Sequence, residues 1–271
     1  MFGEQNMRSG RTLVYLCLLA TATSVFGFAV GVLHARWADA ASTTTRADAN
    51  NARIVAEVKA ELANEMGLVP VRLLRDRRSS FVELYAVDSL GKTHYGTAGY
   101  LGRGYFITVK HAVVGIRSGD GDGVTPIESV HVVYRGEQIP AKIVDTGNAN
   151  VEVHPGDWAI IHSRDVDLPA LKVDTAFAFD FASPIFRLGN DYSRGIILSS
   201  GYVGQRTQNG LVTCLIDGHP GVSGGGVLDQ RGNLVGIPIG RLDGDYRFSF
   251  LLPLRPEMLR KVPPAPEDQA D

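Results

Sequence analysis

The stretch GHPGVSGGGV, residues 218–227, places one serine, Ser223, among glycines and a proline, with few bulky side chains nearby. Such a stretch fits either a nucleophile loop, in which the backbone packs closely around a reactive hydroxyl, or a glycine-rich surface turn. A serine hydroxyl is a poor nucleophile without a base, and the base needs a carboxylate to orient it. If Ser223 is a nucleophile, the rest of the chain must supply a histidine and an acid.

The order of residues along the chain limits which histidine can serve Ser223. The segment GVSGG fits the G-x-S-x-G elbow of α/β-hydrolases, but that fold needs a histidine after the serine, and none follows Ser223. The order His–Asp–Ser remains. His111 is the predicted base because it comes directly after the strand-like run at 105–109. The other histidines lie in strand patterns, beside turns or near the N-terminal apolar run.

The carboxylate that would orient His111 has two main candidates. Asp157 stands at the start of the hydrophobic strand in HPGDWAIIHS, residues 154–163, where the chain would hold it rigidly. Asp145 ends the run AKIVD and then meets the turn signal TGN. We predict Asp157 as the partner, and Asp145 remains the alternative.

Composition excludes several classes of protein. The 271 residues carry a formal net charge of −2, which implies no general attraction to nucleic acid. Cys17 lies in the apolar N-terminal run and Cys214 is the only other cysteine, so a disulfide framework is not supported. No His-, Cys- and carboxylate-rich pattern suggests a metal site, and we expect neither a metal nor another cofactor.

Short runs rich in Val, Ile, Tyr and Phe alternate with Gly, Asp and Asn clusters from about residue 80 onward. Little helical periodicity separates these runs, which predicts an all-β barrel or sandwich. The segment RPEMLRKV at 255–262 predicts a short helix, and 263–271 reads as a disordered tail. The strand-like runs are FVELYAV, YFITV, SVHVVYR, QIPAKIVD, WAIIHS, PIFRLG, GIILSSGYVG, LVTCLI, LVGIPIG and RFSFLLPL.

The N-terminal region predicts a membrane anchor. Residues 12–33 contain no charged side chain, and a helix of that length crosses about 30 Å of hydrocarbon. Arg8 and Arg11 precede the run, which favours a cytoplasmic segment 1–11 and a single-pass anchor over 12–34. The remainder would then be periplasmic or extracellular. The alternative is a signal peptide cleaved near Ala40, at the end of ADA, which would release a secreted protein.

Residues 35–78 read as a linker followed by a short helical stalk. The small polar stretch at 38–50 has the composition of a linker. Within 51–66 the apolar residues recur at a helical spacing, which gives one stripe along a helix. We expect this stalk helix to pack on the following domain or on a partner.

Four segments of the chain, taken in order, resemble one family of enzymes. They are similar to the His segment, the Asp segment, the Ser segment and the closing strand and helix of trypsin-like serine proteases, in particular of the HtrA (Deg) branch. The matching segments are GTAGYLGRGYFITVKHAVVG (96–115), AKIVD followed by DWAII (141–161), HPGVSGGGVLDQRGNLVGIPIG (219–240) and FSFLLPLRPEMLRKV (248–262).

The resemblance implies a two-barrel chymotrypsin-like domain over 79–262, with barrels at about 79–174 and 175–254. In that family the first barrel supplies His and Asp and the second supplies Ser. By resemblance, His111 would be the general base, Asp157 would fix its tautomer, and Ser223 would attack the substrate. The backbone N–H groups of Gly221 and Ser223 would stabilise the oxyanion. Too few residues follow Ser223 for the PDZ domain that is usual in HtrA proteins.

Substrate recognition is less constrained by the sequence. An extended peptide would bind along the strand that contains Ile239. Asp217 lies six residues before Ser223, where trypsin-like proteases place the base of the primary specificity pocket, and would favour Arg or Lys there. The HtrA branch usually has a small or apolar residue at this place, and DG at 217–218 is also a common turn dipeptide. A shifted loop would put His219 at the pocket wall instead.

These inferences predict a membrane-anchored serine endopeptidase that acts on proteins or peptides through a His–Asp–Ser triad. Nucleic acid is not an expected partner, and a homo-oligomer remains open. The alternative is a catalytically silent protease-like module that binds peptides or partner proteins at the membrane.

Overall fold

The computed structural model describes residues 49–62, 71–116, 125–191, 195–242 and 245–264. The chain divides into two units, one up to Leu62 and one from Ala63 onward. In the first unit, residues 49–62 form a helix inside the segment where the sequence predicts a stalk. Its apolar residues are each about half exposed; they are Ile54, Val55, Val58 and Leu62.

The predicted membrane anchor, 12–34, lies outside the described residues. None of the helices in the described ranges is both long enough and apolar enough to cross a membrane. The end of the predicted stalk and the tail at 265–271 also lie outside the described residues.

The first barrel of the second unit closes in the strand order β1-β2-β3-β6-β5-β4, and each strand pairs antiparallel with its neighbours. Alternation of side chains explains how these strands bury one face. In β1, for example, Leu84 and Ala86 are buried in the core while Tyr85 between them is only half-buried. The strands are β1 (Phe81–Asp88), β2 (Thr93–Gly102), β3 (Tyr105–Thr108), β4 (Ile127–Tyr134), β5 (Glu137–Thr146) and β6 (Ala159–His162).

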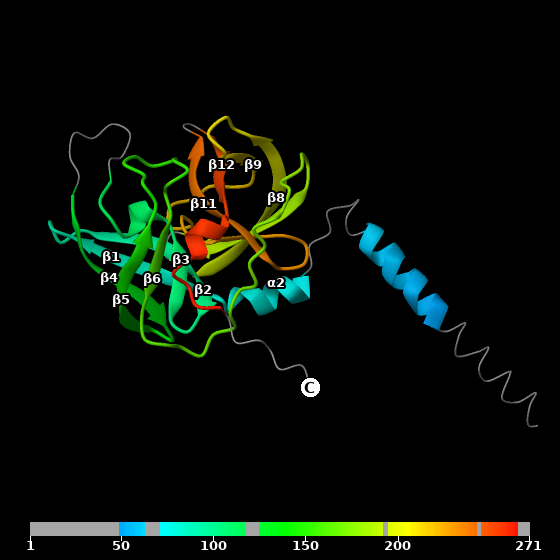
Figure 1. Ribbon diagram of the computed structural model, residues 1–271, viewed down its shortest axis with the longest axis horizontal. Helices are drawn as coiled ribbons and strands as arrows, with labels where there is room; N and C mark the ends of the chain where they lie inside the picture. The colour runs from blue at the N-terminus through cyan, green and yellow to red at the C-terminus, as the bar shows by residue number, and fades with distance from the viewer. Residues whose placement is uncertain (1–48, 63–70, 117–124, 192–194, 243–244, 265–271) are drawn as a thin grey trace, which may run out of the picture. The chain divides into compact units, whose positions relative to one another are not determined.

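The second barrel closes in the order β10-β11-β12-β9-β8-β7. Figure 1 shows its strands in yellow-green to red, beside the teal and green strands of the first barrel. The strands are β7 (Pro184–Asn190), β8 (Ile196–Arg206), β9 (Val212–Leu215), β10 (Gly226–Leu228), β11 (Leu234–Leu242) and β12 (Asp245–Pro253). The predicted all-β, two-barrel architecture is therefore confirmed.

The two barrels pack directly against each other, and this approach needs glycine. A Cβ atom on Gly226 of β10 would collide with the ring of Phe81 in β1. The glycines after Ser223 thus have a packing role as well as a place in the serine loop.

The secondary structure expected from the sequence lacks some elements of the fold and differs in the length of others. The expected strands omit β2 and β10, both of which are rich in glycine, and glycine is depleted in strands. They also omit the helix α2 (Val71–Arg78), which buries Leu74. The helix expected at 255–262 is shorter, a 3₁₀ turn η2 (Pro256–Leu259); a second 3₁₀ turn, η1 (Lys110–Ala112), follows β3.

Candidate active site

Strand pairing brings His111 and Asp157 together from distant parts of the chain. Strand β3 ends at Thr108 and leads into η1, which contains His111. Strand β6 begins at Ala159, and Thr108 pairs with Ala159 in antiparallel register. Because the end of one antiparallel strand meets the start of its partner, the residues just outside the two strands become neighbours.

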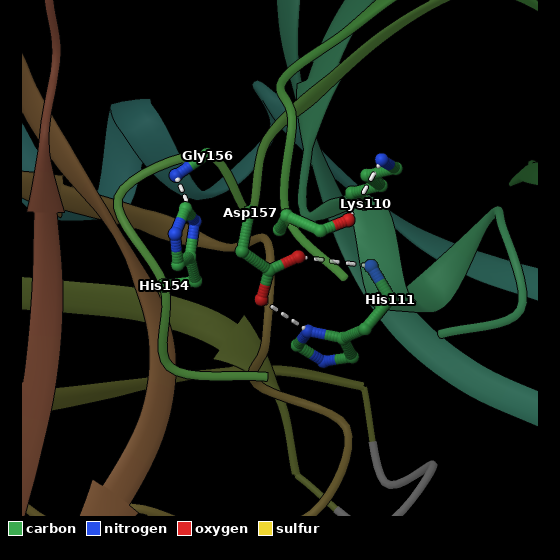
Figure 2. Close-up of polar contacts among 6 residues, drawn as sticks. Lys110, His111, His154, Gly156 and Asp157 are labelled. Atoms are coloured by element: carbon green, nitrogen blue, oxygen red, sulfur yellow. Dashed lines mark hydrogen bonds and ion pairs between the residues drawn. The ribbon is translucent and has the colours of Figure 1, made fainter. Parts of the chain in front are cut away.

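Asp157 holds His111 through two hydrogen bonds. The backbone N–H of His111 donates to Oδ1 at 2.9 Å, and the ring Nδ1 lies 2.7 Å from Oδ2, as Figure 2 shows. The side chain of Asp157 is fully buried and that of His111 is 16% exposed. A carboxylate accepts hydrogen bonds, so Nδ1 carries the proton and Nε2 of the neutral ring is left as a proton acceptor.

Electrostatics at His111 favour its protonated form. Burial alone would lower the pKa of His111, but the hydrogen bond and charge of Asp157, together with the charge of Glu152, outweigh burial and raise this pKa above its usual value. A buried imidazole with a raised pKa is suited to accepting a proton from a neighbouring hydroxyl.

The turn that carries Asp157 is fixed from several directions. The Asp157 N–H donates to the His154 carbonyl at 2.9 Å, and the Gly156 N–H donates to Nδ1 of His154 at 2.9 Å (Figure 2). Arg255, which follows β12, donates from Nη2 to the Pro155 carbonyl at 3.0 Å. The second barrel therefore helps to hold the acid of the first.

Lys110 fixes the loop that leads to this turn. Its Nζ donates to the carbonyls of Gly147 at 3.0 Å and Ala149 at 2.8 Å. The residue next to His111 in sequence thus ties η1 to the loop before Asp157.

The alternative acid, Asp145, lies elsewhere. Its carboxylate forms an ion pair with Nζ of Lys261 at 3.1 Å and accepts a hydrogen bond from the N–H of Thr146. The structure therefore brings Asp157, and not Asp145, to His111.

The serine loop begins with a tight turn at His219–Val222. The Val222 N–H donates to the His219 carbonyl at 3.3 Å, and Gly221 has φ +98°. Proline at the second position and a positive φ at the third define a type II turn, and only glycine takes that φ without strain. In a type I turn the plane of the peptide group between Pro220 and Gly221 would be flipped over. The turn type therefore sets the direction in which the Gly221 N–H points.

Two backbone donors at the start of this loop have no acceptor among the residues that the structure describes. Across the described ranges, no backbone or side-chain acceptor receives a hydrogen bond from the N–H of Gly221 or of Ser223. The next two N–H groups are both paired, Gly224 with the Pro238 carbonyl at 3.1 Å and Gly225 with that of Val222 at 2.9 Å.

Thr97 of β2 ties the serine loop to the first barrel. Its N–H donates to the Ser223 carbonyl at 3.0 Å, and its Oγ1 donates to the Gly221 carbonyl at 2.8 Å. The same Oγ1 accepts from the Asn190 N–H of β7 at 2.8 Å, and the Thr97 carbonyl accepts from Oγ1 of Thr108 at 2.7 Å. This fully buried residue joins β2, and through Thr108 the end of β3, to the loop that carries Ser223.

His111 and Ser223 line one pocket of about 430 Å³ between the barrels. Ile239 and His219, both predicted to contact substrate, also line it. Among the described residues, no hydrogen bond joins His111 to Ser223. Such contacts are often long without substrate and tighten in the complex.

Asp217 does not reach this pocket. Its side chain is exposed and lines a separate depression with Ser200, Tyr202 and Arg247. The structure thus does not support the expectation of a partly desolvated carboxylate at the base of the specificity pocket. Gly218 and His219, the next residues, line the pocket instead.

In the described part of the chain, no group of three or more His, Cys, Asp or Glu side chains is placed to hold a metal ion.

Comparison with protein families agrees with this arrangement. The model of the trypsin-like peptidase domain matches residues 96–237, which is more than half of the chain and includes His111, Asp157 and Ser223. The chain belongs to the trypsin-like peptidase family. It is a serine endopeptidase of this family. No curated protein sequence matches it.

Solved structures share the fold of this peptidase at low sequence identity. The active form of the Rv3671c protease from M. tuberculosis is 17% identical with a TM-score of 0.56, over 67% of this chain and 78% of that one. The serine endoprotease from Yersinia pestis is 20% identical with a TM-score of 0.55, over 69% and 64%. The HtrA-type protease AlgW with a tripeptide is 19% identical with a TM-score of 0.56, over 69% and 60%.

Sequence reasoning missed several residues that organise the site. Thr97, Lys110 and Arg255 act through backbone carbonyls of other segments, and no motif marks such contacts in advance. Arg241 of β11 and Ser249 of β12 also line the pocket, and no sequence motif indicates that these two residues belong to it.

Proposed function

We propose that the peptidase hydrolyses peptide bonds through a triad of Ser223, His111 and Asp157. The observation that carries this proposal is that His111, held by Asp157 through two hydrogen bonds, lines the same pocket as Ser223. Nε2 of His111 is the proton acceptor that a serine nucleophile requires.

The reaction follows from these positions. Ser223 Oγ attacks the scissile carbonyl carbon while His111 Nε2 takes the hydroxyl proton. The imidazolium, stabilised by Asp157, then gives this proton to the leaving amine, and an acyl-enzyme remains on Ser223. A water molecule, deprotonated by His111, attacks the ester and releases the acid product and the free serine.

We assign the stabilisation of the oxyanion that forms in each step to the N–H groups of Gly221 and Ser223. Both are unused donors within the described residues, and the type II turn sets the direction of the first. Losing one such donor typically costs about 2.7–4 kcal/mol of transition-state stabilisation.

The direct experiment is labelling of the full-length protein with a fluorophosphonate probe, followed by peptide mapping. The expected result is a single adduct on Ser223 and loss of peptidase activity in step with labelling. An active enzyme whose adduct lies on another serine would contradict the assignment.

We also propose that residues 12–34 anchor the peptidase as a single-pass protein, with the catalytic domain in the periplasm or outside the cell. The support is the charge-free run at 12–33 behind Arg8 and Arg11.

Carbonate extraction of membranes tests the anchor. The protein is expected to remain in the pellet at nearly full length, because extraction at high pH removes peripheral proteins and leaves spanning helices in place. A soluble product that starts near Ala41 would show instead that the ADA segment is a cleavage site.

Thr97→Val is expected to lower both activity and stability. The valine has nearly the same shape but loses the hydroxyl that donates to Gly221 and accepts from Asn190. Leaving these buried groups unpaired costs about 1–3 kcal/mol of folding free energy. Because the serine loop is then less well positioned, kcat should fall by roughly 10- to 100-fold with little change in KM.

Thr97→Ser separates positioning from packing. It keeps the hydroxyl and loses only a methyl group, so most of kcat should return while some stability stays lost. Denaturant unfolding and steady-state kinetics measure the two effects. A normal kcat in Thr97→Val would rule out the positioning role.

A further inference from the structure

The loop at 149–156, which leads to Asp157, reaches across the pocket to the second barrel. A Cβ atom built on Gly240 of β11 would lie 2.5 Å from Cγ2 and 3.8 Å from Cβ of Val153. The side chain of Val153 is therefore in contact with the face of Gly240, and both residues line the same pocket as Ser223. An extended peptide has the width of a strand, so it cannot pass between two groups that already touch.

Val153 holds this position in an unfavourable backbone conformation. Its φ is +54°, in the left-handed region, and among the non-glycine residues with positive φ in the described ranges it is the β-branched one. A branched Cβ crowds the backbone there, so the conformation persists only where the surrounding contacts enforce it. Strained residues of this kind concentrate at clamps and switches, where the strain is released when the segment moves.

The ends of this loop are fixed, whereas its tip is not enclosed. At the ends, the Ala149 N–H donates to the Gly156 carbonyl at 3.3 Å, and Nζ of Lys110 donates to the Ala149 carbonyl at 2.8 Å. At the tip, the side chains of residues 151–153 are exposed or half-buried. A movement of the tip can therefore leave the turn that carries Asp157 in place.

The strand behind this contact offers an open edge beside the serine loop. Within the described residues, β10 pairs with β11 only up to Gly236, so the rest of β11 has β12 on one side and no strand on the other. The N–H of Gly224, next to Ser223, donates to the Pro238 carbonyl at 3.1 Å, so the open edge begins at the serine loop. An extended peptide adds to such an edge as a further strand, and there it passes Gly240.

We propose that Val153 is an internal gate residue: its side chain occupies the place at Gly240 that a substrate must take, so the tip of the loop has to move before a peptide is cleaved. The inference rests on the proposed function, since it assumes that the peptide lies along β11 with its scissile carbonyl at Ser223. Only molecules with the gate open bind the peptide, so the closed fraction raises the apparent Kd and the KM. Opening relieves the strained φ of Val153, which makes the closed form easier to displace.

Val153→Gly tests the gate by removing the contacting atoms, and glycine accepts a φ of +54° without strain. On the full-length protein, KM for a peptide with four residues before the scissile bond should fall by roughly 10-fold while kcat stays near the wild-type value. Val153→Ala also removes Cγ2 and should give most of this effect. The rate of labelling by a small alkyl fluorophosphonate should not change, because that probe needs only Ser223 and its oxyanion donors. An unchanged KM in both variants, or a labelling rate that rises by the same factor, would overturn the gate.

Arg135→Gly is the matched control for strain. Arg135 has φ +51° in the exposed turn between β4 and β5, so the substitution relieves the same kind of strain away from the pocket. The KM of this variant should stay at the wild-type value. A fall as large as that in Val153→Gly would show that contact with Gly240 is not the cause, and the proposal would fail.

A reversible cross-link tests the gate in the opposite direction. The 3.8 Å between Cβ of Val153 and a Cβ built on Gly240 is the usual Cβ separation in a disulfide, so Val153→Cys combined with Gly240→Cys should join the loop to β11 under a mild oxidant. The oxidised form should lose more than about 10-fold in kcat/KM for the peptide, and a thiol reductant should restore it. Each single cysteine variant should show no such redox dependence. A cross-linked enzyme that is as active as the reduced one would contradict the proposal, and so would failure of the cross-link to form.

Binding to Ser223→Ala separates the gate from the proposed function. This variant cannot form an acyl-enzyme, so fluorescence anisotropy with the same peptide reports binding alone. If Val153→Gly tightens binding by about 10-fold in the Ser223→Ala background, the gate stands even when the wild type neither cleaves the peptide nor takes the probe. Equal Kd values with and without Val153→Gly would overturn the gate and leave the triad assignment untouched.

Discussion

Ser223→Ala is expected to abolish peptide hydrolysis and fluorophosphonate labelling while the fold stays intact. Removing the nucleophile of a triad typically costs about 10⁶-fold in kcat, because no other group can form the acyl-enzyme. The substitution removes only a hydroxyl. The carbonyl of Ser223 would still accept from Thr97, so the loop should keep its path.

Ser200→Ala is the matched control for this experiment. Ser200 is an exposed serine on β8 that lines the depression with Asp217, away from His111. Its activity and labelling should equal those of the wild type. Undiminished peptidase activity in purified Ser223→Ala would remove Ser223 from the mechanism. A folded wild type that binds peptides but neither cleaves them nor takes the probe would favour the silent binding module.

Features that depend only on nearby residues can be predicted well from the sequence. The runs that became β1, β3, β7 and β11 carry their own pattern of apolar and polar residues, and the order of His, Asp and Ser is read directly along the chain. The strand β2 was missed because its glycines weaken that pattern. They are present because the chain must pass close to other segments: a Cβ on Gly96 would lie 3.3 Å from Cβ of Ala112, next to His111, and 3.5 Å from the Ser223 carbonyl.

The specificity pocket shows why spacing alone misleads. Asp217 has the expected distance from Ser223 in sequence, but spacing does not say which way a side chain points. Here the loop turns Asp217 to solvent and buries Gly218. Arg241, which lines the pocket beside Gly218, comes from β11 and meets Gly218 only when the second barrel has closed.

Thr97 illustrates a second limit. It lies in a glycine-rich stretch of β2 and looks unremarkable as a polar strand residue. Its four hydrogen bonds reach three other segments, Thr108, Asn190 and the loop at 221–223. No local pattern encodes such contacts, because they join segments that lie far apart in the sequence and, for three of the four bonds, belong to different barrels.

Asp157→Asn is expected to lower kcat by about 10⁴-fold with little change in KM. Asp157 accepts from both the backbone N–H and the ring Nδ1 of His111, and a carboxylate can accept both bonds. The amide of asparagine has one oxygen and one NH₂ group, so it can accept only one of them. If the NH₂ group faces the ring, Nδ1 must be the acceptor, Nε2 then carries the proton, and His111 cannot act as a base.

Asp145→Asn provides the comparison that decides between the two acids. Asp145 pairs with Lys261, whose side chain is 54% exposed, so its loss should cost at most about 1 kcal/mol of stability and leave kcat nearly unchanged. Steady-state kinetics on both variants, with unfolding measured in parallel, gives the answer. If Asp145→Asn loses activity by the large factor and Asp157→Asn does not, the orienting acid is Asp145, and the contact between Asp157 and His111 is structural only.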